Sequence, residues 1–140
     1  MTQIVRHILL ALLAAALTAG VAFAEPPRYR TVIQVSENDT KKWNALFGNI
    51  RNVQAELGRE RIAVAVVAIG PGIDMLKADS LVANRVEEAM ADGVRFVACE
   101  NTMKAQHVPR EDMLDRIDYV PAGFAEIIRL QQEGWAYLRP

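Results

Sequence analysis

The strongest candidate for chemistry in this chain of 140 residues is its single cysteine, Cys99. Cys99 follows an apolar, β-branched segment at 94–98 and precedes a helix expected over 101–107. The N-terminus of a helix stabilises negative charge and lowers the pKa of a nearby thiol, and the thiolate is the reactive form of cysteine. The position therefore predicts a nucleophile, with Lys104 adding to this effect and Glu100 opposing it.

A second interpretation makes Cys99 an inert, buried apolar residue, which is a common fate of free cysteine. Export of the chain would weigh against it, because exported proteins usually pair their cysteines. A leftover thiol in such a protein suggests reactivity or an intermolecular bond. Both interpretations remain open from the residues alone.

A third interpretation is a soft-metal site. Cys99, Met103 and His107 follow one another at intervals of four, which would place them on one side of a continuous helix, and their soft ligands suit copper. However, we expect Cys99 to precede the helix, and Pro109 follows His107 closely. Zinc is less favoured, because it needs three or four ligands and residues 25–140 hold one histidine and one cysteine. We therefore expect no metal and no bound cofactor.

A glycine-rich turn, Gly70-Pro71-Gly72, follows a second apolar segment. Glycines after a strand allow the backbone to approach a ligand or phosphate closely, or they simply form a tight turn. The chain has no complete G-x-G-x-x-G pattern and no P-loop lysine, so the nucleotide signal is weak. It also has no G-x-S-x-G pattern, so an α/β-hydrolase is unsupported.

The first 24 residues resemble a secretory signal. They contain one charged side chain, Arg6, an apolar run over 8–17 and an A-x-A cleavage pattern that ends at Ala24. The run is short for a membrane span of about 20 apolar residues, so an uncleaved anchor is the less favoured alternative. We expect cleavage near Ala24, a single domain over 25–140, a periplasmic or secreted location, and no stable membrane insertion after cleavage.

Charge and composition exclude other classes. Residues 25–140 carry 15 Lys and Arg against 17 Asp and Glu, so the domain is not basic enough to predict nucleic-acid binding. One cysteine allows no internal disulfide and no Cys-rich metal site.

The elements that must position Cys99 alternate along the chain. Helix N-cap residues are expected around Asp39 and at Asp79 or Ser80. The sequence predicts strands at 31–35, 62–69, 94–98, 118–120 and 135–138, a short turn at 73–77, and helices over 43–57, 81–90, 101–107 and 123–132. This alternation predicts an α/β fold with a parallel sheet and helices on both faces. Ligands bind at the carboxyl ends of parallel strands, which here are 36–39, 70–72, 99–102 and 121–123.

Residues 96–104 (FVACENTMK) resemble the strand–Cys–helix segment of the DsrE/DsrF-like sulfur-relay family, in the TusD/YchN superfamily. The segments at 49–52 (NIRN), 70–73 (GPGI) and 132–137 (QEGWAY) resemble its exported subgroup. The resemblance extends over residues 29–140. It implies a three-layer α/β/α domain with a five-stranded, mainly parallel sheet, assembled into trimers or hexamers.

The resemblance also implies a function. Relay members accept a sulfane sulfur as a persulfide on a cysteine and pass it to a partner, and Cys99 occupies that position. The protein would be a sulfur carrier or sulfurtransferase whose partners are sulfur donors and acceptors, either proteins or small sulfur compounds. The characterised relay is cytoplasmic whereas this chain has an export signal, so the donor and acceptor stay open. The pocket wall around Cys99 would be formed by Gly70, Pro71, Gly72, Asn101 and Thr102.

Overall fold

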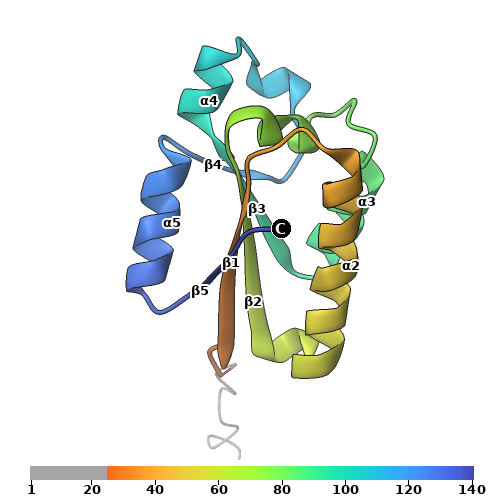
Figure 1. Cartoon of the computed structure of the whole chain (residues 1–140), viewed down its shortest axis with the longest axis vertical. Coiled ribbons are helices and arrows are strands. Elements are labelled where there is room, and N and C mark those ends of the chain that lie inside the picture. The colour runs from red at the N-terminus through yellow and green to blue at the C-terminus, as the bar shows by residue number, and fades with distance from the viewer. Residues whose placement is uncertain (1–24) are drawn as a thin grey trace, which may run out of the picture.

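The computed structural model describes residues 25–140, so the predicted signal segment lies outside the described residues. The chain forms a five-stranded sheet in the order β4-β3-β2-β1-β5, and every neighbouring pair is parallel. The predicted α/β fold is confirmed, with a sheet that is parallel throughout (Figure 1). The strands are β1 (Tyr29–Val35), β2 (Ile62–Ala68), β3 (Val94–Cys99), β4 (Asp118–Val120) and β5 (Ala136–Leu138).

Helices cover both faces of this sheet. In Figure 1, α2 and α3 lie on one side, α5 lies on the other, and α4 lies beyond the carboxyl ends of the strands. Among residues 25–140, no helix is both long and apolar enough to span a membrane. The helices are α2 (Thr40–Leu57), α3 (Ala83–Ala91), α4 (Glu100–Ala105) and α5 (Gly123–Gln132), with 3-10 turns at Arg59–Arg61, Gly70–Leu76 and Arg110–Asp112.

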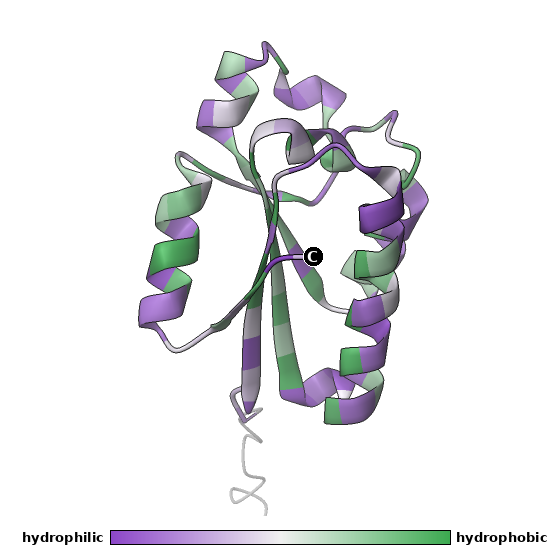
Figure 2. Cartoon of the chain, in the orientation of Figure 1, coloured by the Kyte–Doolittle hydropathy of each residue, from purple (hydrophilic) through white to green (hydrophobic). Residues whose placement is uncertain are grey.

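Alternation along each strand divides the apolar core between the two faces. In β3, Phe96 and Ala98 belong to the core beneath α2 and α3, whereas Val97 and Cys99 belong to the core beneath α5. Figure 2 shows the strands largely apolar and much of the outer surface of α2 polar. We call the two sides the α2/α3 face and the α5 face. The side chain of Cys99 is thus directed to the α5 face by its position in the strand.

Asp39 and Gly58 set the ends of α2, as the sequence predicts for the start and end of this helix. The Asp39 carboxylate accepts hydrogen bonds from the backbone N–H groups of Lys41 at 2.9 Å and Lys42 at 3.1 Å. Gly58 follows the last turn with a φ of 89°, a conformation that glycine adopts without strain. The first turn of α2 is therefore fixed next to the carboxyl end of β1.

The start of α3 differs from the prediction. The helix begins at Ala83 rather than at 81, neither Asp79 nor Ser80 is its N-cap residue, and Leu81 is 84% exposed instead of packing inward. The reason is tertiary, because Lys77 forms an antiparallel bridge with Met113 and the next residues turn before the helix begins. The predicted short turn at 73–77 is likewise part of a 3-10 helix, Gly70–Leu76, that starts directly after β2.

The apolar residues of α5 are divided between buried and exposed positions. Ile127 and Leu130 are buried against the sheet, whereas Phe124 and Ile128 are exposed. Positions 124 and 128 share one stripe of the helix, and this stripe is turned away from the one that holds 127 and 130. One helix thus covers the α5 face with few buried contacts.

Candidate functional site

The carboxyl ends of all five strands meet at one edge of the sheet, where they surround a pocket of about 640 Å³. The strand-end segments that the sequence predicted as the ligand edge all contribute, and β5 adds a fifth. Such an edge is the usual ligand site of open parallel sheets. The wall is formed by Gln34, Ser36, Ile69, Gly70, Pro71, Cys99, Asn101, Thr102, Ala105, Ala122, Gly123, Phe124 and Arg139.

Cys99 is the last residue of β3 and immediately precedes α4. Its surface is 6% exposed, and it contributes to the wall of the pocket. The backbone N–H of Gly123, at the start of α5, donates a hydrogen bond to the Cys99 Sγ at 3.2 Å. The thiol is therefore recessed at the pocket and held by groups from two neighbouring strand ends.

Thr102 connects the thiol to the glycine-rich turn. Its Oγ1 accepts a hydrogen bond from the backbone N–H of Gly70 at 3.0 Å. Because Gly70 supplies a donor, the hydroxyl hydrogen of Thr102 remains available to Cys99, and the Thr102 side chain lowers the pKa of this thiol. Thr102 thus acts as a positioning residue between the ends of β2 and β3.

Two opposing effects determine the pKa of Cys99. Burial raises the pKa, whereas hydrogen bonds from the Thr102 side chain and from the backbone N–H groups of Gly123, Thr102 and Asn101 lower it. The hydrogen bonds prevail, so the pKa of the Cys99 thiol lies below its ordinary value. The N–H groups at the start of α4 contribute to this lowering, although that of Asn101 also donates to the carbonyl oxygen of Pro121, and Gly123 adds a donor from a different strand end.

The two charges expected to act on the thiol have other neighbours. Glu100 forms an ion pair with Arg110 at 2.5 Å. Lys104 lines a different cavity, together with Met103 and His107. The largest causes of the lowered pKa of Cys99 are uncharged donors, and neither charge is among them.

The glycine-rich turn has two roles. Gly70 and Pro71 line the pocket with Cys99, as do Asn101 and Thr102. Gly72 is not in the pocket wall, because it packs against the end of β1, where a side-chain Cβ would clash with the carbonyl oxygen of Val35. The sequence predicts a glycine at a close approach, and the structure shows that backbone rather than ligand is approached at Gly72.

The three soft ligands proposed for copper are separated. Cys99 lies on the α5 face, Met103 is buried in the core of the α2/α3 face, and His107 lines the second cavity. The three residues do not share one side of a helix, because Cys99 precedes α4, as the sequence predicts, and His107 follows it with a φ of 55°. Within residues 25–140, no three His, Cys, Asp or Glu side chains are grouped closely enough to hold a metal ion.

Sequence reasoning missed several wall residues, among them Gln34, Phe124 and Arg139. Arg139 follows β5, which pairs in parallel with β1 and so ends at the same edge as the other strands. The predicted strand at 135–138 was the available signal, since its carboxyl end implies a contribution from residue 139. Gln34 had no such signal, because it lies within β1 and reaches the pocket only through the strand's alternation.

Solved structures resemble this fold. The protein of unknown function MTH1491 from Methanobacterium thermoautotrophicum is 39% identical, with a TM-score of 0.77 over 80% of this chain and 99% of its own. The protein BT1422 from Bacteroides thetaiotaomicron is 14% identical, with a TM-score of 0.64 over 79% of this chain and 94% of its own. The YchN protein from E. coli is 7% identical, with a TM-score of 0.64 over 82% of this chain and all of its own, which shows a shared fold.

Comparison of the sequence with known families identifies the family of this chain. No curated protein matches this chain. A family model, however, matches residues 9–140, which is most of the sequence and includes every residue of the pocket. Together with the parallel sheet and the identity to MTH1491, this match shows that the chain belongs to the DsrE/DsrF-like family.

Proposed function

We propose that this protein carries sulfane sulfur as a persulfide on Cys99 and passes it to an acceptor. Its family is related to sulfur relay, which gives the general direction. The observation that carries the proposal is the thiol itself, because it lies in the wall of a pocket, accepts a hydrogen bond from the Gly123 N–H at 3.2 Å and has a lowered pKa. Thiolate character and access are what nucleophilic attack on sulfur requires.

The proposed reaction balances without an oxidant. The Cys99 thiolate attacks the outer sulfur of a donor persulfide, a new S–S bond forms at Sγ, and the donor leaves as a thiolate with the electron pair of the broken bond. An acceptor thiolate then attacks the outer sulfur on Cys99, and Cys99 leaves as a thiolate. The same donors that favour attack also favour departure, since a thiol of low pKa is the better leaving group.

We also propose a location, partners and an oligomeric state for the protein. We place it in the periplasm or outside the cell, because the segment over 1–24 has the pattern of a signal peptide. Its donor and acceptor would then be exported proteins or small sulfur compounds. We also propose a homo-oligomer, a trimer or hexamer, as the family resemblance implies.

A second candidate function is a non-catalytic oligomeric binding module. The low exposure of Cys99 favours it, because a thiol with 6% of its surface accessible can also be a packing residue. The two candidates differ in one property. A carrier thiol reacts in the folded protein, whereas a packing thiol reacts only after unfolding.

Mass spectrometry of the native protein after incubation with inorganic polysulfide tests the proposal. We expect the wild type to gain the mass of added sulfur, and this mass to disappear on reduction with dithiothreitol. Cys99→Ser is the matched control, because it keeps the size of the side chain and removes the sulfur nucleophile. Absence of added mass in the wild type, or equal addition to Cys99→Ser, would contradict the proposal.

Alkylation kinetics separate the two candidates. For a carrier, iodoacetamide labels Cys99 in native buffer and not only in denaturant. Labelling confined to the unfolded protein would support the binding module instead.

A further inference from the structure

The pocket around Cys99 has one charged side chain in its wall. Among the described residues that line it, Arg139 is charged and the other twelve are neutral. Its guanidinium comes from the end of β5, whereas the thiol comes from the end of β3, and β1 and β2 lie between these two strands in the sheet. The positive charge of Arg139 and the thiol of Cys99 therefore belong to different parts of the pocket wall.

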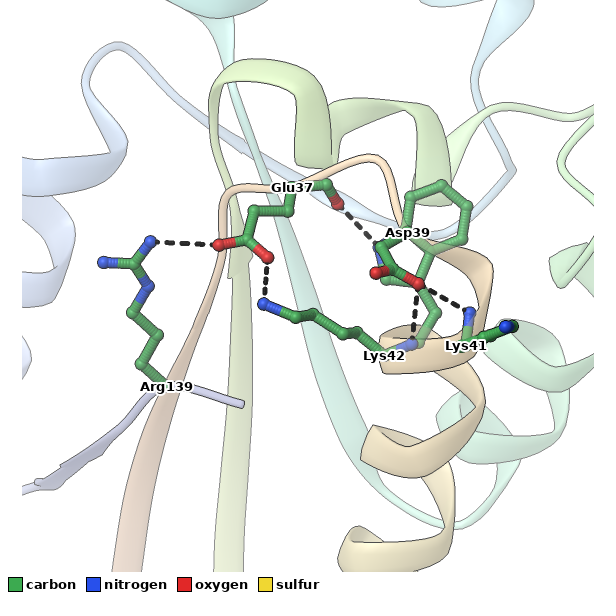
Figure 3. A network of polar contacts seen from close by, with 6 residues as sticks. Glu37, Asp39, Lys41, Lys42 and Arg139 are labelled. Atoms are coloured by element: carbon green, nitrogen blue, oxygen red, sulfur yellow. Dashed lines mark hydrogen bonds and ion pairs between the residues drawn. The ribbon is translucent and has the colours of Figure 1, made fainter.

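Arg139 is held loosely in its present position. Its Nη2 lies 3.3 Å from Oε1 of Glu37, and its side chain is 52% exposed. The other oxygen of Glu37 forms an ion pair with Lys42, and Figure 3 shows the carboxylate between the two cations. Lys42 lowers the pKa of Glu37 more than Arg139 does. Glu37 would thus keep its stronger partner if Arg139 turned to a ligand, and exposed ion pairs of this kind contribute little to stability.

Gln34 adds a second polar group to the same wall. It is 7% exposed, and its Oε1 accepts a hydrogen bond from the Tyr137 hydroxyl at 2.8 Å. With the oxygen engaged, the Nε2 donors are the part of this amide that remains for a ligand in the pocket. Donors from Arg139 and Gln34 in a wall without carboxylates complement a ligand that is rich in acceptor oxygens and negatively charged.

We propose that Arg139 is the residue that recognises an anionic sulfur donor, a sulfane sulfur attached to an oxyanion as in thiosulfate. The inference rests on the proposed function and names its substrate class. In the step it implies, the Cys99 thiolate attacks the outer sulfur of thiosulfate and forms a new S–S bond. The S–S bond of thiosulfate breaks, and sulfite leaves with the electron pair.

Charge explains why such a donor needs this arginine. A thiolate and a dianion repel one another, and this repulsion opposes their encounter within the pocket. A guanidinium binds two oxyanion oxygens at once, which offsets the repulsion and orients the group. A neutral reagent has no oxyanion for the guanidinium to bind, so the contribution of Arg139 to the reaction rate depends on the charge of the reagent.

The first experiment uses two reagents of similar size that differ in charge. The rate of Cys99 alkylation is measured with iodoacetate and with iodoacetamide in native buffer. We expect Arg139→Gln to lower the ratio of the two rates about tenfold, the loss expected for a charge-assisted contact. The ratio is independent of the thiol pKa, because both reagents attack the same thiolate. Arg51→Gln is the matched control, since it removes an exposed charge of α2 outside the pocket and leaves the ratio unchanged.

The second experiment measures binding without thiol chemistry. Thiosulfate is titrated calorimetrically into Cys99→Ser at constant ionic strength, and the same titration is made with Arg139→Gln added. We expect heat of binding from the single variant and its loss from the double variant. Cys99→Ser with Arg51→Gln retains binding.

The results separate the two proposals. An unchanged alkylation ratio, or equal thiosulfate binding with and without Arg139, overturns the role of Arg139 while polysulfide loading of Cys99 can still succeed. Failure of polysulfide loading, with thiosulfate bound through Arg139 in Cys99→Ser, overturns the carrier function and leaves an anion site. A Glu37→Gln variant supports the inference if it raises the iodoacetate preference, because it removes the carboxylate that competes for Arg139.

Discussion

The two faces of the sheet differ in what they bury. The α2/α3 face holds the larger core, in which Phe96 packs against Phe47 with ring centroids 6.4 Å apart. The α5 face holds a smaller, mainly aliphatic core, and Cys99 is one of its members. The α2/α3 face therefore supplies most of the apolar burial, and the α5 face holds the thiol of Cys99.

The two faces also differ in the polar contacts of their helices. On the α5 face, the carboxylate of Glu126 is buried and forms ion pairs with Arg95 at 2.9 Å and with Arg129. Arg95 also pairs with Asp118 at 2.5 Å, next to the short strand β4. Helix α5 is thus attached to the sheet partly by charge, whereas α2 and α3 are attached mainly by apolar packing. The position of α5 depends on fewer buried carbon atoms. The same holds for the Gly123 N–H at its start, which donates to the Cys99 Sγ.

The largest expected effect comes from neighbouring residues of β3 on opposite faces. We expect Phe96→Ala to lower the free energy of unfolding by about 3–5 kcal/mol, because it leaves a large cavity in the larger core. Val97→Ala, on the α5 face, is expected to lower it by about 2 kcal/mol, from two lost carbon atoms and a smaller cavity. Urea unfolding measures both, and equal losses would argue against unequal faces.

Replacing a glycine by alanine adds a methyl group, and one such substitution on each side of the sheet tests the difference between the faces. In Gly123→Ala the new Cβ would clash with Ile69 and lie 3.2 Å from the Cys99 Cβ, so we expect a loss of about 1–3 kcal/mol and slower alkylation of Cys99. In Gly48→Ala, within α2, the Cβ meets no atom within 4 Å, so we expect a gain of about 0.5–1 kcal/mol and unchanged alkylation. Faster alkylation of Gly123→Ala would contradict the role assigned to the Gly123 N–H.

The smallest expected effect concerns the Thr102 hydroxyl. Thr102→Val removes the hydroxyl that lowers the pKa of Cys99 and that accepts from the Gly70 N–H, so the pKa of the thiol rises and the midpoint of the alkylation rate against pH moves upward. Thr102→Ser keeps the hydroxyl and should restore the midpoint, which a purely steric role of Thr102 would not predict. Alkylation with iodoacetamide across pH measures all three proteins.

The same variant has a consequence for stability. The folded pKa of Cys99 is depressed, so the folded state releases its proton at a lower pH than the unfolded thiol, whose pKa is about 8.5. The wild type therefore gains unfolding free energy as pH rises from the folded pKa toward that value, and loses it as pH falls through the folded pKa. Thr102→Val should show a smaller gain, and a gain equal to that of the wild type would contradict the hydrogen bond.

Much of the fold followed from local pattern. The apolar segments predicted β2 and β3 within one residue of their observed ends, and the predicted helix over 123–132 matches α5. These elements carry strong signals, namely unbroken apolar runs and glycines at their ends. The strand-end rule then placed Gly70, Pro71, Asn101 and Thr102 beside Cys99, because parallel strands bring their carboxyl ends to one edge.

The remaining features depend on contacts that local pattern does not encode. The start of α3 is determined by the bridge between Lys77 and Met113, which are 36 positions apart. The position of Gly72 against Val35 depends on the pairing of β1 with β2. Arg139 entered the pocket because β5 joins the sheet beside β1, an order that spacing along the chain leaves open.

The recessed position of Cys99 limits what its sulfur can meet. A disulfide requires the two Cα atoms to approach within about 7 Å, and the Cα of Cys99 lies at the end of an inner strand beside the start of α5. The burial of Cys99 in the pocket wall opposes such an approach between two copies of the folded chain. We therefore expect small reagents to reach the thiol more readily than a second copy does, so air oxidation of the native protein should crosslink it only slowly through Cys99.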